Sequence, residues 1–209
     1  MNMNLPNKLT VLRLCLVPVL LLVGMLPSSV IPFYVSCVIC AVLFIGTAVT
    51  DMLDGKIARS RNLITDFGKF LDPIADKFMV IGAMFVILHK FAQLRTIMIF
   101  VLLIVVFREL AVTSMRLVVS TGEHIVIAAN SLGKIKTVSQ IVAISTVFLE
   151  PVVQLIVRWI AEMVTGKPLF WRTDIVPLTW ASLLFCVVMT VWSGMNYILS
   201  YWKYLDPQK

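Results

Sequence analysis

The segment DMLDGKIARSRNLITDFGKFLDPIADK, residues 51–77, is the part of the chain from which the rest can be interpreted. It packs five carboxylates, three lysines and two arginines into 27 residues. Asp54 follows Asp51 by three residues, and Asp76 follows Asp72 by four. Both spacings put a pair of side chains on one face of an α-helix. The pattern predicts two helix ends that meet across a short loop, with their acids converging.

A glycine accompanies each acid pair. Gly55 lies four residues after Asp51, and Gly68 lies four before Asp72. A residue without a side chain leaves room for a bulky ligand near the backbone. The alternative is a solvated loop whose charges mark a membrane boundary, but the helical spacings and the paired glycines favour a binding site.

The composition is that of a membrane protein. Of the 209 residues, 60% are hydrophobic and 14% charged, and the mean hydropathy is +0.97. A soluble domain carries about 25% charged residues. We therefore predict one integral membrane domain over residues 1–209. The net charge of +7 suggests membrane topology and anionic lipid headgroups rather than a nucleic acid.

Apolar runs long enough to cross a bilayer, which takes about 20 residues, predict an all-α bundle of six transmembrane helices. The fifth is expected to be broken by Glu150-Pro151, with a kink at that point. The expected spans are residues 9–26, 33–50, 70–88, 96–119, 132–157 and 175–199.

The basic residues predict the orientation. Twelve lie on the side of the N-terminus and five on the other, while Arg108 lies within a span. The excess places both termini, the acidic segment and a polar active-site cavity on the cytoplasmic side of the cytoplasmic membrane.

Cysteine and histidine offer little chemistry. Cys37 and Cys40 form a C-x-x-C, but all four cysteines lie in apolar runs, where a reactive thiol is not expected. His89 and His124 are far apart. An all-oxygen carboxylate cluster instead suits Mg²⁺ or Mn²⁺. Such cations serve phosphoryl-type transfer, and Arg59 could add a phosphate contact.

The full pattern D-x-x-D-G-x-x-A-R, eight residues, G-x-x-x-D-x-x-x-D resembles the signature of the CDP-alcohol phosphatidyltransferase family. The resemblance implies that an alcohol hydroxyl attacks the β-phosphorus of a CDP-linked donor and releases CMP. It also assigns roles. One or two divalent ions would be held by Asp51, Asp54 and Asp72; Asp76 would be the catalytic base and a further metal ligand; and the CDP pocket would contain Gly55, Ala58, Arg59 and Gly68.

The acceptor is predicted from residues further along the chain. Arg108 and Arg116 are eight residues apart, on roughly one side of the fourth span, and Lys134 and Lys136 open the fifth. An arginine within a span is costly unless it faces a partner or a water-filled cavity. These cations predict a dianionic acceptor, with Arg108, Arg116 and Lys134 gripping its phosphate. Alternatively, Glu109 or an acid of the cluster neutralises Arg108.

The R-E-x-x-V-T-x-x-R and G-K-x-K-T segments resemble the family branch that uses sn-glycerol 3-phosphate. The expected enzyme converts CDP-diacylglycerol and glycerol 3-phosphate to phosphatidylglycerophosphate and CMP, as a homodimer among membrane lipids. The alternatives are another acceptor (phosphatidylglycerol, inositol phosphate or serine) or a cation transporter. No role is assigned to Asn7, Thr10, Arg13 and Lys136.

Overall fold

The computed structural model describes residues 4–60, 65–122, 131–166 and 176–202, apart from the side chains of 54, 56–60, 69 and 120–122. The described chain contains helices and no strand, which confirms the predicted all-α fold. The helices are α1 (Leu5–Met25), α2 (Phe33–Ser60), α3 (Asp66–Lys90), the short 3-10 helix η1 (Ala92–Leu94), α4 (Arg95–Gly122), α5 (Ser131–Thr165) and α6 (Pro177–Tyr201).

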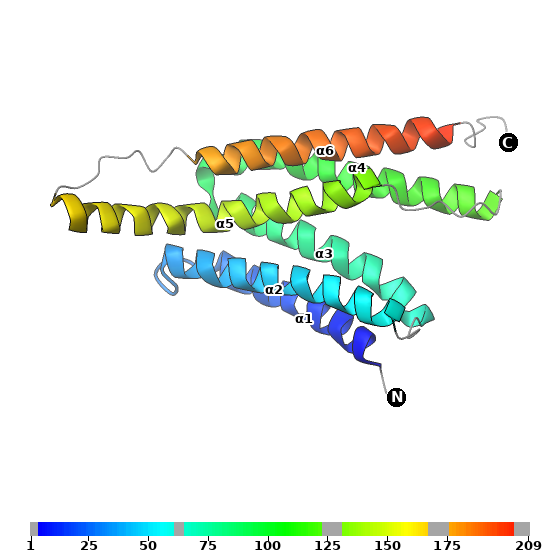
Figure 1. Cartoon of the computed structure of the whole chain (residues 1–209), viewed down its shortest axis with the longest axis horizontal. Coiled ribbons are helices and arrows are strands. Elements are labelled where there is room, and N and C mark those ends of the chain that lie inside the picture. The colour runs from blue at the N-terminus through cyan, green and yellow to red at the C-terminus, as the bar shows by residue number, and fades with distance from the viewer. Residues whose placement is uncertain (1–3, 61–64, 123–130, 167–175, 203–209) are drawn as a thin grey trace.

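The long helices run alternately up and down the bundle (Figure 1). At one end of the bundle α1, α3 and α5 begin, and α2, α4 and α6 end. The end of α2 and the start of α3 therefore lie near each other, as the acid spacing predicts. The acid-bearing turns and the basic segments of α4 and α5 belong to this same end.

Five of the described helices are long and apolar enough to cross a membrane: Leu5–Met25, Phe33–Leu53, Ala92–Val119, Ser131–Thr165 and Pro177–Tyr201. Large apolar side chains are exposed on the outer faces of the bundle, for example Leu22, Leu103 and Leu184. A soluble monomer rarely exposes so much apolar surface, so these faces are typical of lipid contact. The remaining predicted span, residues 70–88, corresponds to α3, which carries Asp72, Asp76 and Lys77 and is not among the five.

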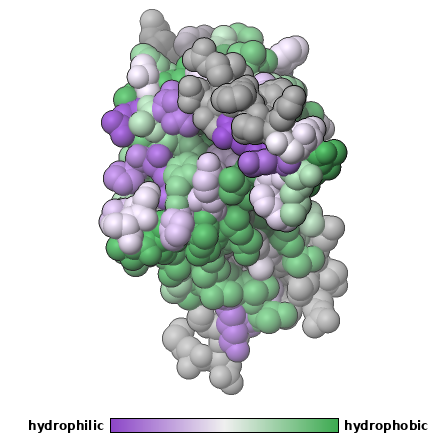
Figure 2. Space-filling view, turned by 90° about the vertical axis from the view of Figure 1, so that its left-hand side faces the viewer, coloured by the Kyte–Doolittle hydropathy of each residue, from purple (hydrophilic) through white to green (hydrophobic). Residues whose placement is uncertain are grey.

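Hydrophilic side chains gather at a bundle end. Figure 2 looks onto the end where α1 finishes and α2 starts, and shows hydrophilic groups in its upper part above a continuous hydrophobic surface. Polar groups are expected where helices leave an apolar layer.

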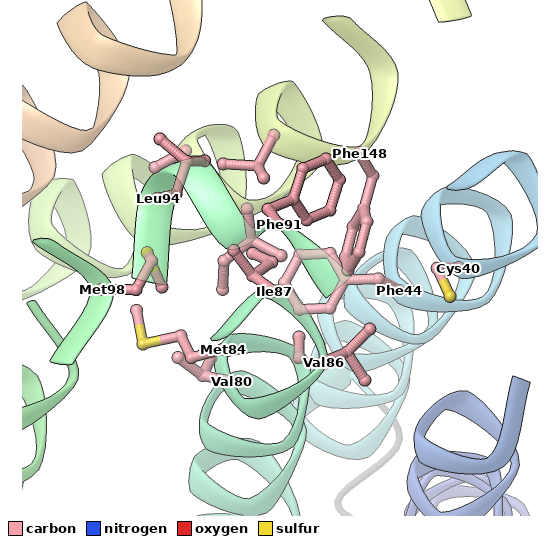
Figure 3. Close-up of a cluster of buried hydrophobic side chains, with 14 of the residues drawn as sticks. Cys40, Phe44, Val80, Met84, Val86, Ile87, Phe91, Leu94, Met98 and Phe148 are labelled. Atoms are coloured by element: carbon pink, nitrogen blue, oxygen red, sulfur yellow. The ribbon is translucent and has the colours of Figure 1, made fainter. Parts of the chain in front are cut away.

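The apolar core holds the helices together where α3 turns through η1 into α4, far along α3 from the acids (Figure 3). Phe44 of α2, Ile87 of α3 and Phe148 of α5 are fully buried there beside Phe91. The rings of Phe91 and Phe148 lie 6.2 Å apart. Cys40 belongs to the same cluster and is a free thiol, in agreement with the inert role predicted for it.

Pro151 does not break the fifth helix, because α5 continues through this residue to Thr165. The kink expected at Pro151 stays a prediction. The buried Glu150 carboxylate accepts the backbone N–H groups of Leu178 at 3.2 Å and Thr179 at 2.7 Å. Those groups lie in the first turn of α6 and have no partner within their own helix. Glu150 thus ties the middle of α5 to the start of α6.

Candidate active site

A cleft of about 840 Å³ lies between α2, α3, α4, α5 and α6. Its apolar walls include Ile45, Val112 and Ile141. Its polar lining contains residues that the sequence assigned to two separate tasks: Asp51 and Asp76 from the acidic segment, and Arg108, Arg116 and Lys134 from the basic segments. Lys136, to which the sequence gave no role, lines the same cleft. The fold therefore brings the predicted base and the predicted acceptor residues to one cavity.

The four predicted metal ligands are not all placed in the same way. Asp51 and Asp76 line the cleft. Asp72 is exposed and is not among the lining residues; its Oδ1 accepts a hydrogen bond of 2.6 Å from the Thr10 hydroxyl. The side chain of Asp54 lies outside the described part of the chain.

The part of the cleft lined by Asp51 and Asp76 is here called its acidic end. Its donor atoms are carboxylate oxygens, which suit a hard divalent cation. Asp51 is held in place by Arg13, whose Nη1 lies 2.5 Å from Oδ1 of the carboxylate. Among the side chains that the structure describes, no group of three or more acids, histidines or cysteines is close enough to hold a metal. Asp51 and Asp76 therefore fit Mg²⁺ or Mn²⁺ by their chemistry, and the four-carboxylate set stays a prediction.

The predicted donor pocket is described only in part. Gly55 lies in α2 one turn after Asp51, and Gly68 lies buried in the first turn of α3. A Cβ atom at Gly68 would lie 3.1 Å from Asn7 Oδ1 and 3.4 Å from Thr65 Oγ1. The space beside Gly68 is thus taken up by α1 and by the start of α3 rather than left open for a ligand. The side chains of Ala58 and Arg59 lie outside the described residues.

The part of the cleft lined by Arg108, Arg116, Lys134 and Lys136 is here called its basic end. Within it, Arg108 is anchored on two sides. Its Nη2 donates a hydrogen bond of 2.6 Å to Ser193 Oγ, and its Nη1 lies 3.3 Å from Glu109 Oε1. The same Glu109 oxygen accepts a hydrogen bond from Lys136. Glu109 does pair with Arg108, as expected if Glu109 neutralises this arginine, but the same carboxylate also binds Lys136. The basic residues lining the cleft thus outnumber Glu109 and leave this end positive.

Tyr197 of α6 connects the two predicted acceptor arginines. Its hydroxyl accepts a hydrogen bond of 2.6 Å from Arg116 Nη2. The guanidinium carbons of Arg116 and Arg108 lie 5.2 Å and 5.9 Å from the centre of the tyrosine ring, within cation–π range. The ring itself is buried and stacks on Tyr201. Its face and its hydroxyl therefore orient both cations.

Sequence reasoning missed Tyr197 and Ser193, and it gave no role to the polar residues of α1. A signal for the first two was available, since a serine and a tyrosine four residues apart share one face of an otherwise apolar span. A signal for the α1 residues was their three-residue spacing. Ser193 and Tyr197 contact α4, and the α1 residues contact the acidic segment. These contacts join distant parts of the chain, so the spacing alone did not reveal them.

The sequence profile of CDP-alcohol phosphatidyltransferases matches residues 3–167. The chain therefore belongs to the CDP-alcohol phosphatidyltransferase family, which confirms the predicted resemblance and the predicted class of enzyme.

Three similar proteins are each named CDP-diacylglycerol–glycerol-3-phosphate 3-phosphatidyltransferase. The protein from Bacillus subtilis (strain 168) is 44% identical over 156 residues, which cover 70% of this chain and 77% of the relative. The protein from Escherichia coli (strain K12) is 31% identical over 201 residues, or 95% and 94% of the two chains. The protein from Wigglesworthia glossinidia brevipalpis is 36% identical over 145 residues, or 69% and 76%.

Proposed function

We propose that the chain transfers the phosphatidyl group of CDP-diacylglycerol to sn-glycerol 3-phosphate, forming phosphatidylglycerophosphate and CMP. One observation carries the proposal: carboxylates from α2 and α3 and a cluster of cations from α4 and α5 line one and the same cleft. The names of the relatives from B. subtilis and E. coli agree with it.

The cationic end suits an acceptor that carries a phosphate. Arg108, Arg116 and Lys134 line the cleft from α4 and α5, and the two guanidinium groups are pre-oriented by Tyr197. A guanidinium binds phosphate through two parallel hydrogen bonds, which fixes the orientation of the ligand as well as its affinity. A neutral alcohol would leave these charges without a partner.

The acidic end supplies the base. With the phosphate of the acceptor held by the arginines, one of its free hydroxyls would point toward Asp76, which lines the same cleft from α3. The Asp76 carboxylate takes the hydroxyl proton, the oxygen forms a bond to the β-phosphorus of the donor, and the bond from that phosphorus to CMP breaks. This role is general base catalysis by a side chain within reach of the reacting proton.

Mg²⁺ or Mn²⁺, one or two ions, would be held by Asp51, Asp54, Asp72 and Asp76. Bound there, the ion would neutralise charge on the donor pyrophosphate. The CDP group of the donor would lie along the helix ends that carry Gly55, Ala58, Arg59 and Gly68. The support is the family membership together with the oxygen ligands at the acidic end of the cleft.

The same proposal includes the arrangement in the membrane. We place six spans in one domain over residues 1–209, with α3 as the span that carries the reactive acids. Both termini and the cleft would face the cytoplasm, and two copies would associate as a homodimer. The alternating helix directions and the excess of basic residues at the N-terminal side support this topology.

A panel of acceptor alcohols tests the function. Purified protein with CDP-diacylglycerol and a divalent ion should release CMP with glycerol 3-phosphate, and far more slowly with glycerol, serine, inositol phosphate or phosphatidylglycerol. Equal rates with glycerol or serine would contradict the assignment of the acceptor. Absence of CMP release with every alcohol would contradict the transferase and favour the cation transporter.

A further inference from the structure

We infer that Asn7, Thr10 and Arg13 of α1, here called the α1 polar strip, position the carboxylates of the acidic segment and thereby set the affinity of the site for its divalent ion. The inference rests on the proposed function, since it concerns the same acids. It gives a role to residues that the sequence alone left unexplained.

The strip is one buried face of a helix. Its residues follow one another at intervals of three, which places them on the same side of α1. Their exposed fractions are 8% for Asn7, 2% for Thr10 and 1% for Arg13. Polar groups are costly to bury unless they find partners, and the described partners of all three include groups within the acidic segment.

Arg13 fixes the acid of α2. Its guanidinium lies 2.5 Å from Asp51 Oδ1, and its side chain is 1% exposed, against 42% for the aspartate. The cation is therefore rigid, while the carboxylate extends from it into the cleft. The ion pair thus fixes the orientation of a carboxylate that lines the cleft.

Thr10 fixes the acid of α3. Its hydroxyl donates a hydrogen bond of 2.6 Å to Asp72 Oδ1. Asp72 is otherwise exposed, so this bond selects one orientation of a side chain that would otherwise sample several. Partners of this kind orient metal ligands, and their loss typically costs about 10- to 100-fold in metal affinity or activity.

Asn7 fixes the point at which α3 begins. Its Oδ1 accepts a hydrogen bond of 3.1 Å from the Thr65 hydroxyl, and Thr65 in turn caps the helix by accepting the backbone N–H of Gly68 at 3.1 Å. The cap determines the register of the helix that carries Asp72 and Asp76.

The packing of the helices explains why such a strip is needed. α1 packs extensively against both α2 and α3, whereas α2 and α3 touch each other little over the described residues. The two acid-bearing helices are therefore held in relation to each other chiefly through α1. The strip lies at the level where all three meet.

Thr10 allows the sharpest test, because valine has nearly the same shape and lacks the hydroxyl. Binding of Mn²⁺ to the purified full chain, without substrates, can be followed by the electron paramagnetic resonance of the free ion. We expect Thr10→Val to raise the Kd for Mn²⁺ by about tenfold or more, and Thr10→Ser to stay close to the parent. In steady-state assays Thr10→Val should lower turnover and leave the KM for glycerol 3-phosphate within about twofold.

Two controls separate positioning from general damage. Thr47→Val makes the same change at a buried threonine of α2 whose hydroxyl bonds to backbone oxygens of its own helix. Val17→Ala lowers stability on the same face of α1, one turn beyond the strip, where Val17 packs close to Gly82. Both should leave the Kd for Mn²⁺ unchanged.

Several results would overturn the inference: Mn²⁺ binding by Thr10→Val equal to that of the parent, equal weakening by Thr47→Val or Val17→Ala, or failure of Thr10→Ser to restore binding. A parent that binds no Mn²⁺ would overturn it together with the metal assignment. A parent that binds Mn²⁺ but does not react with glycerol 3-phosphate would count against the proposed function alone.

Discussion

The two ends of the cleft are built in different ways. At the acidic end the reactive groups come from one segment of 27 residues, and polar side chains of α1 bind Asp51 and Asp72. At the basic end they come from α4 and α5, and α6 orients them through Ser193 and Tyr197. The acidic end depends on local spacing, whereas the basic end depends on how three helices pack. A variant at the acidic end should therefore change catalysis or metal binding, whereas a variant at the basic end should change the binding of the acceptor.

The largest expected effect is at the acidic end, at the proposed base. Asp76→Asn keeps the size of the side chain and removes its ability to accept a proton, so turnover should fall by about 10²- to 10⁴-fold. The KM values for both substrates should change far less. Single-turnover measurements of CMP release would report the chemical step directly.

Asp66→Asn is the matched control, because Asp66 lies in the first turn of the same helix, is exposed, and is outside the family pattern. It should retain nearly full turnover. Near-normal turnover in Asp76→Asn would show that another group takes the proton.

The contrast between the two ends also explains what the sequence could predict. The acid pairs were found because residues three or four positions apart lie on one face of an α-helix. The helices were predicted because the apolar runs are long enough to cross a bilayer. Arg108 and Arg116 were found because a charged side chain within a membrane span is costly unless it faces a partner or a water-filled cavity. All these signals lie within one helix or one short segment.

The rest depends on contacts between distant parts of the chain. The hydrogen bonds of Arg108 to Ser193 and of Arg116 to Tyr197 join residues more than eighty positions apart. The sharing of Glu109 between Arg108 and Lys136 depends on the register of α5 against α4. The space beside Gly68 looked free in the sequence because nothing there shows that Asn7 occupies it.

A smaller effect, confined to the acceptor, is expected at the basic end. Charged hydrogen bonds of this kind are worth about 1.5–3 kcal/mol, so Arg108→Ala or Arg116→Ala should raise the KM for glycerol 3-phosphate by roughly ten- to hundredfold. The KM for CDP-diacylglycerol should barely change. Lysine at either position should restore only part of the affinity, because a point charge cannot reproduce the guanidinium fork.

Arg95→Ala provides the comparison within the same helix, since Arg95 begins α4 at the opposite end of the bundle. Its kinetics should match those of the parent. If Arg108→Ala or Arg116→Ala instead raised the KM for CDP-diacylglycerol, these arginines would belong to the donor pocket. The division of the cleft into two ends would then be wrong.

The smallest effect tests whether α6 orients the basic end. Tyr197→Phe removes the hydroxyl that accepts from Arg116 at 2.6 Å and keeps the ring face toward both guanidinium groups. Losing one hydrogen bond of about 1 kcal/mol should raise the KM for glycerol 3-phosphate about fivefold. Tyr197→Leu removes the ring as well and should cost more, because Arg108 then also loses its cation–π contact. In both variants the Kd for Mn²⁺ and the KM for CDP-diacylglycerol should match the parent, since the acidic end is held from α1. An equal loss of metal binding would mean that the two ends of the cleft are coupled through the bundle and are not positioned independently.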